Sequence, residues 1–247
     1  MKRVGSVTGM LGYCTRLLSA CLLLAPAAWG NNVVLHYNPR PPYLSVVDGQ
    51  LVGLTGSPAA AAFRAAGVAV ALVETPAARQ LKVLEAGRGP DCAVGWFKNP
   101  QRKAFAKFSK PIYRDQPPVA LRLAGAEQPA DGQPVESLLS SKTMVLLVKQ
   151  SYSYGAGLDA LIEQHQPKRI STTDESRLML KSLVLRVADY MFMAPEEVDP
   201  TIAAAGFERV QFKVVKPGAM PVGEYRYILC SKQVPDTVME RLNAAIK

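Results

Sequence analysis

The sequence predicts an α/β fold made of two similar units. Patterns typical of strands and helices alternate from residue 33 to residue 97, an order that gives a mostly parallel sheet flanked by helices. A stiff polar stretch at residues 114–118, which contains two prolines, then interrupts the alternation. The same alternation restarts at Val119, so we expect a second sheet beyond this link.

The first unit has clear start and stop signals for its elements. Ser57 and Pro58 suit the start of one helix, and Thr75 and Pro76 suit the N-cap and first position of the next. Gly87 ends that second helix. The expected strands cover residues 33–37, 51–54, 68–73 and 91–97, and the expected helices cover residues 57–66 and 76–86.

The second unit repeats this rhythm. The apolar stripe of Met179, Leu180 and Leu183 marks the core-facing side of one of its helices. The expected strands cover residues 119–123, 143–148, 170–172, 187–193 and 207–215, and the helices cover 135–140, 158–164 and 174–186. A linker at 216–223, a strand at 225–230 and a helix from Pro235 complete the chain.

The first thirty residues are typical of a cleaved signal peptide. Lys2, Arg3 and Arg16 precede an apolar run at residues 17–29, and the small residues needed by a signal peptidase follow at its end. This run is shorter than the roughly 20 residues that a membrane-spanning helix requires. Residues 1–30 therefore predict export to the periplasm.

The charge of the chain sets weak limits on its partners. Removing residues 1–30 removes three basic and no acidic side chains, which leaves 26 basic against 20 acidic residues and a net charge of +6. This excess suits an anionic ligand, an acidic envelope surface or a merely solvated basic surface. No block of lysine and arginine is interleaved with aromatic residues, so a nucleic-acid partner is not expected.

The segment from Thr75 to Tyr113 carries the most specific pattern in the chain. An Asn-Pro turn follows the apolar run 91–97, so Arg102 is expected just beyond the carboxyl end of a strand, where open α/β sheets bind ligands. The order of residues in this segment resembles that of the family 3 extracellular solute-binding proteins, the receptors of polar amino-acid ABC transporters. The residues that carry the resemblance are Arg79, Leu84, Gly87, Asp91, Arg102, and the run Phe108-Ser109-Lys110-Pro111-Ile112-Tyr113.

This resemblance implies a type II periplasmic binding protein-like fold of two lobes. Lobe 1 would contain residues 31–115 and 218–247, and lobe 2 residues 116–217. Cys14 and Cys21 would leave with the signal peptide, so Cys92 and Cys230 would remain in an oxidising compartment. The family fold would bring the strand at 225–230 beside the early strands. A Cys92–Cys230 disulfide and two free thiols are both compatible with the sequence.

The resemblance also nominates ligand-binding residues. Arg102 would hold a ligand carboxylate with a bidentate fork, although it could instead be a surface arginine among neighbouring lysines. Tyr43 would cover the ligand or pack against the prolines before it. Trp96 and Phe97, at a strand end, would line the ligand or pack in the core. Ser151 and Ser153 at a strand-to-helix turn and Asp189 in a later strand are further candidates. Arg79 would lie at the cleft floor, in an inter-lobe ion pair or on the surface.

The chain departs from the family at two ligand-contacting positions. Relatives carry a glycine-x-x-x-aspartate near the first helix, whereas residues 53–58 read Gly-Leu-Thr-Gly-Ser-Pro. A second aspartate usually meets the ligand ammonium, and this position is Ala194. Burying an ammonium without a counter-charge is costly. An ordinary α-amino acid therefore fits this chain less well than it fits the family, and another small carboxylate is an alternative ligand.

Three functions remain open from the sequence. The first is a monomeric solute receptor that delivers its ligand to an ABC permease. The second is a sensor of the same fold that acts on a signalling partner. The third is a cleft enzyme of the dehydratase type, in which Glu74 or Asp189 would act. His36 and His165 lack the spacing of metal ligands, so we expect no metal, no cofactor and no catalytic residues.

Overall fold

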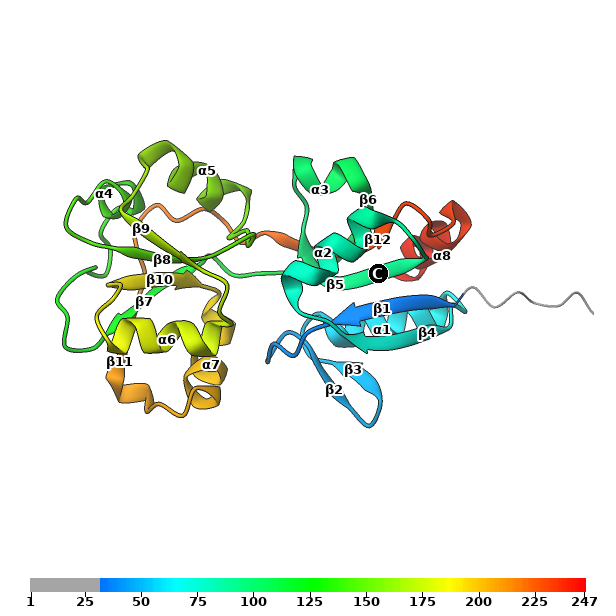
Figure 1. The fold of residues 1–247 in the computed structure, drawn as a ribbon, viewed down its shortest axis with the longest axis horizontal. Coiled ribbons are helices and arrows are strands. Elements are labelled where there is room, and N and C mark those ends of the chain that lie inside the picture. Colours follow the sequence, from blue (N-terminus) through cyan, green and yellow to red (C-terminus); the bar gives the residue numbers. More distant parts are fainter. Residues whose placement is uncertain (1–31) are drawn as a thin grey trace, which may run out of the picture.

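The computed structural model describes residues 32–247, and these form two α/β lobes joined by two crossing segments (Figure 1). Each lobe has a five-stranded sheet flanked by helices, so the predicted two-lobed fold is confirmed. The signal peptide predicted at residues 1–30 lies outside the described residues. Within residues 32–247, every helix is too short or too polar to cross a membrane.

The sheet of lobe 1 contains strands from both ends of the described chain. Its order is β4-β1-β5-β12-β6, with β1 parallel to β4 and β5, and β12 antiparallel to β5 and β6. Four strands therefore run in one direction, as expected of a mostly parallel sheet, and β12 runs in the opposite direction because it returns from lobe 2. The strands are β1 (Val33–Tyr37), β4 (Val70–Glu74), β5 (Asp91–Phe97), β6 (Ala106–Arg114) and β12 (Tyr225–Ser231). A hairpin of β2 (Ser45–Val47) and β3 (Gln50–Val52) and the helices α1 (Gly56–Ala65), α2 (Ala77–Ala86), α3 (Pro100–Phe105) and α8 (Asp236–Ala245) complete the lobe.

The sheet of lobe 2 has the order β11-β7-β10-β8-β9 and is mixed. β8 is parallel to β9 and β10, whereas β7 is antiparallel to β10 and β11. The strands are β7 (Val119–Leu123), β8 (Leu146–Lys149), β9 (Arg169–Thr172), β10 (Tyr190–Met193) and β11 (Phe212–Val215). The helices are α4 (Val135–Leu139), α5 (Ala156–His165), α6 (Ser176–Val184) and α7 (Val198–Ala204), with single 3-10 turns η1 (Pro195–Glu197) and η2 (Arg209–Gln211).

Each sheet is covered on both faces by apolar side chains from its helices. In lobe 1, α1 and α8 pack on one face, where Phe63 and Leu242 meet Ile228, and α2 places Leu84 on the other face against Leu229. Adjacent residues of β12 thus point into different cores, as the two-residue period of a strand requires. In lobe 2, α6 and α7 cover one face and α4 and α5 the other.

Several elements differ from the predicted ones, and among them the strand expected at 207–215 begins only at Phe212. Residues 99–105 form a capped helix after β5, because the Asn99 side chain accepts a hydrogen bond from the backbone N–H of Arg102 at 2.9 Å. Residues 106–114 form β6, which tolerates Pro111 because it is an edge strand. The helix α7 was not predicted at all. Thr75 does not cap α2, since its hydroxyl lies 2.9 Å from Nδ1 of His36.

A disulfide joins Cys92 of β5 to Cys230 of β12. The two residues are direct partners in the strand register, their sulfur atoms are 2.03 Å apart, and both are fully buried. The predicted bridge is therefore confirmed, and it links residues 138 positions apart in the sequence.

The two crossing segments run side by side between the lobes. The backbone N–H of Asp115 in the first segment donates to the carbonyl of Glu224 in the second at 3.0 Å. A Cβ at Gly223 would lie 1.7 Å from the carbonyl oxygen of Asp115, so a side chain at this position would separate the segments. The Asp115 carboxylate accepts two hydrogen bonds from Arg226 of β12, both at 2.6 Å. Both side chains are buried, so this pair fixes the first crossing to lobe 1.

Removing the disulfide should destabilise the protein. Replacing both cysteines by alanine should lower the free energy of unfolding by about 2–4 kcal/mol, because the unfolded chain then loses a long covalent loop. The measurement is the thermal midpoint with and without a reductant. Reductant should lower the midpoint of the native protein and leave that of the Cys92→Ala/Cys230→Ala variant unchanged. An equal response of the two proteins would contradict the bridge.

Neutralising Asp115 should cost far more than neutralising an exposed acid. Asp115→Asn keeps the side-chain shape but leaves the buried guanidinium of Arg226 without a counter-charge, which should cost about 3–5 kcal/mol. Asp199→Asn is the matched control, because Asp199 pairs with Arg209 at the surface, and it should cost less than about 1 kcal/mol. Urea unfolding at neutral pH measures both values. Similar costs would show that Asp115 does not anchor the crossing.

Candidate functional site

The surfaces between the lobes are formed by loops that follow the carboxyl ends of strands. Lobe 1 contributes the loop after β1 and the end of β5, and lobe 2 contributes the loops after β8 and β10. This is the position at which open α/β sheets bind ligands. Two adjoining cavities of about 40 and 50 Å³ lie there, and both are lined by Phe97, Tyr152 and Arg226.

Arg40 and Glu197 join the lobes directly. Arg40, in the loop after β1, donates hydrogen bonds from Nε and Nη2 to the two carboxylate oxygens of Glu197 in η1, the second at 2.5 Å. Glu197 is only 3% exposed. Burial alone would lower the pKa of Arg40, but Glu197, Tyr152 and Tyr43 together outweigh it and raise the pKa above the ordinary value. Arg40 therefore stays charged.

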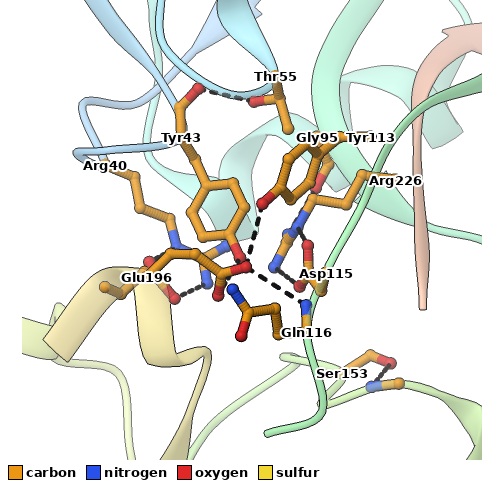
Figure 2. A network of polar contacts seen from close by, with 12 residues as sticks. Arg40, Tyr43, Thr55, Gly95, Tyr113, Asp115, Gln116, Ser153, Glu196 and Arg226 are labelled. Carbon is orange, nitrogen blue, oxygen red and sulfur yellow. Dashed lines mark hydrogen bonds and ion pairs between the residues drawn. The ribbon is translucent and has the colours of Figure 1, made fainter. Parts of the chain in front are cut away.

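The guanidinium of Arg226 lies at the centre of a larger polar network (Figure 2). It stacks between the rings of Tyr43 and Phe97, with both centroids 4.3 Å away, and Nη1 donates to the carbonyl of Gly95 at 2.9 Å. Gly95 has φ +83° and forms a bulge in β5, which turns this carbonyl towards the guanidinium. Three of the donors of Arg226 are thus used within the protein.

The carboxylate of Glu196 accepts hydrogen bonds from lobe 1 and from the first crossing segment. Its carboxylate accepts from the hydroxyls of Tyr113 at 3.0 Å and Tyr43 at 3.4 Å, and from the backbone N–H of Gln116 at 3.3 Å (Figure 2). Burial and the hydrogen bond to Glu196 raise the pKa of Tyr113 to about 12, so this phenol remains a donor at neutral pH. Glu196 and Glu197 together bind lobe 2 to lobe 1.

Arg102 lies buried at the second cavity without an acidic partner among the described residues. It is 5% exposed, its Nη1 donates to the carbonyl of Phe97 at 2.8 Å, and its guanidinium lies 4.7 Å from the ring centroid of Trp96. Burial lowers its pKa from the ordinary value. It forms no salt bridge with any of the residues 32–247. An anion in this cavity would therefore gain a counter-charge at no cost to an existing ion pair.

Hydrogen bonds fix the walls around Arg102. The indole N–H of Trp96 donates to the Gln80 side chain at 3.1 Å, and Gln80 in turn donates to the carbonyl of Thr75 at 2.7 Å. From lobe 2, the hydroxyl of Ser153 donates to Asp159 at 2.5 Å. Residues 32–247 contain no cluster of His, Cys, Asp and Glu that could hold a metal ion.

The structure brings five of the eight predicted ligand-binding residues together around the second cavity. These residues are Tyr43, Trp96, Phe97, Arg102 and Ser153. Ser151 is exposed and lines an outer groove on the other side of Arg102, which it shares with Tyr152. Tyr43 does not cover an open space, because its ring packs on Arg226 and its carbonyl accepts from the hydroxyl of Thr55.

Asp189 and Arg79 both lie away from the two cavities, and for Arg79 the structure gives the surface position that the sequence had left open. Asp189 precedes β10 and accepts a hydrogen bond from the backbone N–H of Val145 at 2.6 Å, at the opposite end of the sheet from the cleft. The predicted strand began too early and therefore misplaced it. Arg79 is exposed beside Lys82 on the outer side of α2. Glu74, the other acid considered for an enzyme, is exposed and lines neither cavity.

Sequence reasoning missed Arg40, Glu197 and Arg226. Arg40 lies among the prolines before Tyr43, and Arg226 lies in the strand expected at 225–230, so neither position marks its residue as part of a site. Glu197 follows the end of β10, so the rule that placed Arg102 beyond a strand end could have found it as well. The position expected to hold a second aspartate, Ala194, lines the first cavity, and Glu197 supplies a carboxylate three residues later.

Comparison with known proteins identifies the fold but no sequence family. No protein-family model matches the chain, and no curated protein matches its sequence. An ancestral arginine-binding protein bound to arginine is 15% identical with a TM-score of 0.65, covering 87% of this chain and 91% of its own. The substrate-binding protein AbpA of an amino acid ABC transporter from Streptococcus pneumoniae, bound to L-arginine, is 16% identical with a TM-score of 0.66, covering 87% of each chain. The arginine-, lysine-, histidine-binding protein ArtJ from Geobacillus stearothermophilus is 18% identical with a TM-score of 0.63, covering 87% of this chain and 88% of its own. The chain thus has the two-lobed fold of ABC-transporter substrate-binding proteins.

Proposed function

We propose that the chain is a solute-binding protein that captures a small carboxylate-bearing ligand between its two lobes. The fold supports a binding role, because solved proteins of this fold bind amino acids. The placement of Glu74 and Asp189 outside the cavities argues against the cleft enzyme considered from the sequence. A non-enzymatic receptor is therefore the better proposal.

The observation that carries this proposal is the state of Arg102. Its guanidinium is buried, stacked on Trp96 and held by one backbone carbonyl, yet it pairs with no carboxylate of the described residues. A planar guanidinium with free donors fits a carboxylate by two parallel hydrogen bonds. Ser153 and Tyr152 face the same cavity from lobe 2, so a ligand on Arg102 would contact both lobes.

The mechanism that we propose is closure of the lobes around the ligand. Cavities of about 40 and 50 Å³ are smaller than the roughly 150 Å³ that accommodates benzene. A ligand of amino-acid size would therefore enter while the lobes are apart. The hinge would be the two crossing segments, with residues 31–115 and 218–247 forming lobe 1 and residues 116–217 forming lobe 2. A ligand that binds both lobes shifts this equilibrium by its differential affinity for the closed form.

We further propose that the protein delivers its ligand to an ABC permease from the periplasm. The predicted signal peptide supports export, and the fold supports membership of a divergent branch of the family 3 solute-binding proteins. Uptake of the identified ligand by cells that have or lack the protein would test delivery. Unchanged uptake together with tight binding would favour a sensor that acts on a signalling partner.

Removing the charge or the fork of Arg102 should abolish ligand binding. The test is a thermal-shift screen against amino acids, small carboxylates and cyclic acids. A ligand at a hundred times its dissociation constant stabilises the folded protein by about 2.7 kcal/mol, which raises the midpoint by several degrees. Arg102→Ala and Arg102→Lys should each weaken binding by about 10- to 100-fold, since a charge-assisted hydrogen bond contributes about 1.5–3 kcal/mol.

Lys103→Ala is the matched control, because Lys103 is an exposed cation next to Arg102 on α3. It should leave affinity unchanged. The proposal would be wrong if no compound raised the midpoint, or if a compound that did so acted equally on the native protein and on Arg102→Ala.

A further inference from the structure

Arg40 is held between the lobes in the way that a guanidinium ligand would be held. Its guanidinium lies 5.2 Å from the ring centroid of Tyr43 in lobe 1 and 5.1 Å from that of Tyr152 in lobe 2. Aromatic rings on two sides attract a cation through the negative faces of their π systems. Arg40 itself also lines both cavities, so its side chain fills space that would otherwise belong to the cleft.

Glu197 completes this arrangement from lobe 2. Both carboxylate oxygens of Glu197 accept hydrogen bonds from the guanidinium of Arg40. Because Glu197 is buried, water cannot easily replace it as the partner of Arg40. A carboxylate with two aromatic neighbours is the chemistry that would otherwise bind a cationic ligand group. Arg40 therefore takes up a cation site that the fold has built between its lobes.

The other carboxylates at the interface also have partners within the protein. Asp115 is bound by Arg226, Glu196 accepts from Tyr113, and Asp159 accepts from Ser153. A ligand ammonium entering this cleft would have to share these carboxylates with the donors that already bind them. Arg102, in contrast, offers a positive charge without a salt bridge to any described residue.

We propose that Arg40 is a built-in occupant of the cleft, which takes up Glu197 and so restricts the site to anionic solutes that lack a cationic group. The restriction to anions rests on the proposed function, whereas the occupancy of a guanidinium site by Arg40 can be tested by itself. In this arrangement Arg40 determines specificity and Arg102 binds the solute.

In the test, a mutation removes the Arg40 side chain and a small free molecule is added to take its place. Arg40→Ala removes the atoms of ethylguanidinium, so millimolar ethylguanidinium chloride should raise the thermal midpoint of this variant. Ethylammonium chloride at the same concentration is the control for charge, and it should have little effect because it lacks the planar fork. The native protein and Arg209→Ala, which loses an exposed arginine of lobe 2, should not be stabilised by either salt.

A second variant decides whether Glu197 is the receptor of the added cation. In Arg40→Ala/Glu197→Gln the rise with ethylguanidinium should disappear, and this variant should fold because it leaves no buried unpaired carboxylate. If Arg40→Ala alone does not fold, recovery of native circular dichroism on refolding with ethylguanidinium, but not with ethylammonium, would support the proposal.

Three results would overturn the proposal. The first is an equal response of Arg40→Ala to both salts, and the second is the absence of any response. The third is a rise that persists in the double variant. None of these results depends on the unidentified solute, so failure here is distinguishable from failure of the Arg102 experiment.

Discussion

The buried guanidinium of Arg226 is the interaction on which the arrangement of the lobes depends. It connects β12 to the bulge of β5 through Gly95 and to the first crossing through Asp115, while its faces pack on Tyr43 and Phe97. A lysine could not provide three directed donors and two stacking faces at one point. The residues that border the cavities in lobe 1 are therefore positioned by one side chain from the returning strand.

This interaction also decides which charges a ligand can reach. Because Arg226 uses its donors on Asp115 and Gly95, it contributes positive potential to the cleft but few free hydrogen bonds. Burial and the neighbouring charge of Arg40 would lower the pKa of Arg226, but Tyr152 and Asp115 outweigh them and raise it above the ordinary value. For Arg102, burial is the dominant effect and lowers the pKa, although Tyr152 and Asp159 act in the opposite direction. Of the arginines that line the two cavities, Arg102 is thus the one without a salt bridge to a described residue.

The sequence predicted the fold well where local patterns decide the structure. The bounds of β1, β5 and β7 follow from short apolar runs, and the position of Arg102 just beyond β5 follows from the Asn-Pro turn that ends this strand. The pairing of Cys92 with Cys230 needed the topology of the family, since strand patterns do not tell which strands are neighbours. Asp189 was misplaced because Val187 and Ala188 extend an apolar run beyond the strand. Arg40 and Glu197 could not be paired from sequence, because their contact depends on how two separately folded lobes meet.

The two arginine–carboxylate pairs differ in what opening of the lobes would do to them. Arg226 and Asp115 lie on lobe 1 and on the crossing fixed to it, so the pair would remain buried. Arg40 and Glu197 come from different lobes, and separation would return both charges to water, where hydration replaces much of the lost attraction. Removing one partner by mutation is more costly than separating both, because the remaining charge stays buried in the closed form. The Arg40–Glu197 pair is therefore suited to a reversible contact, and the Arg226–Asp115 pair to a permanent one.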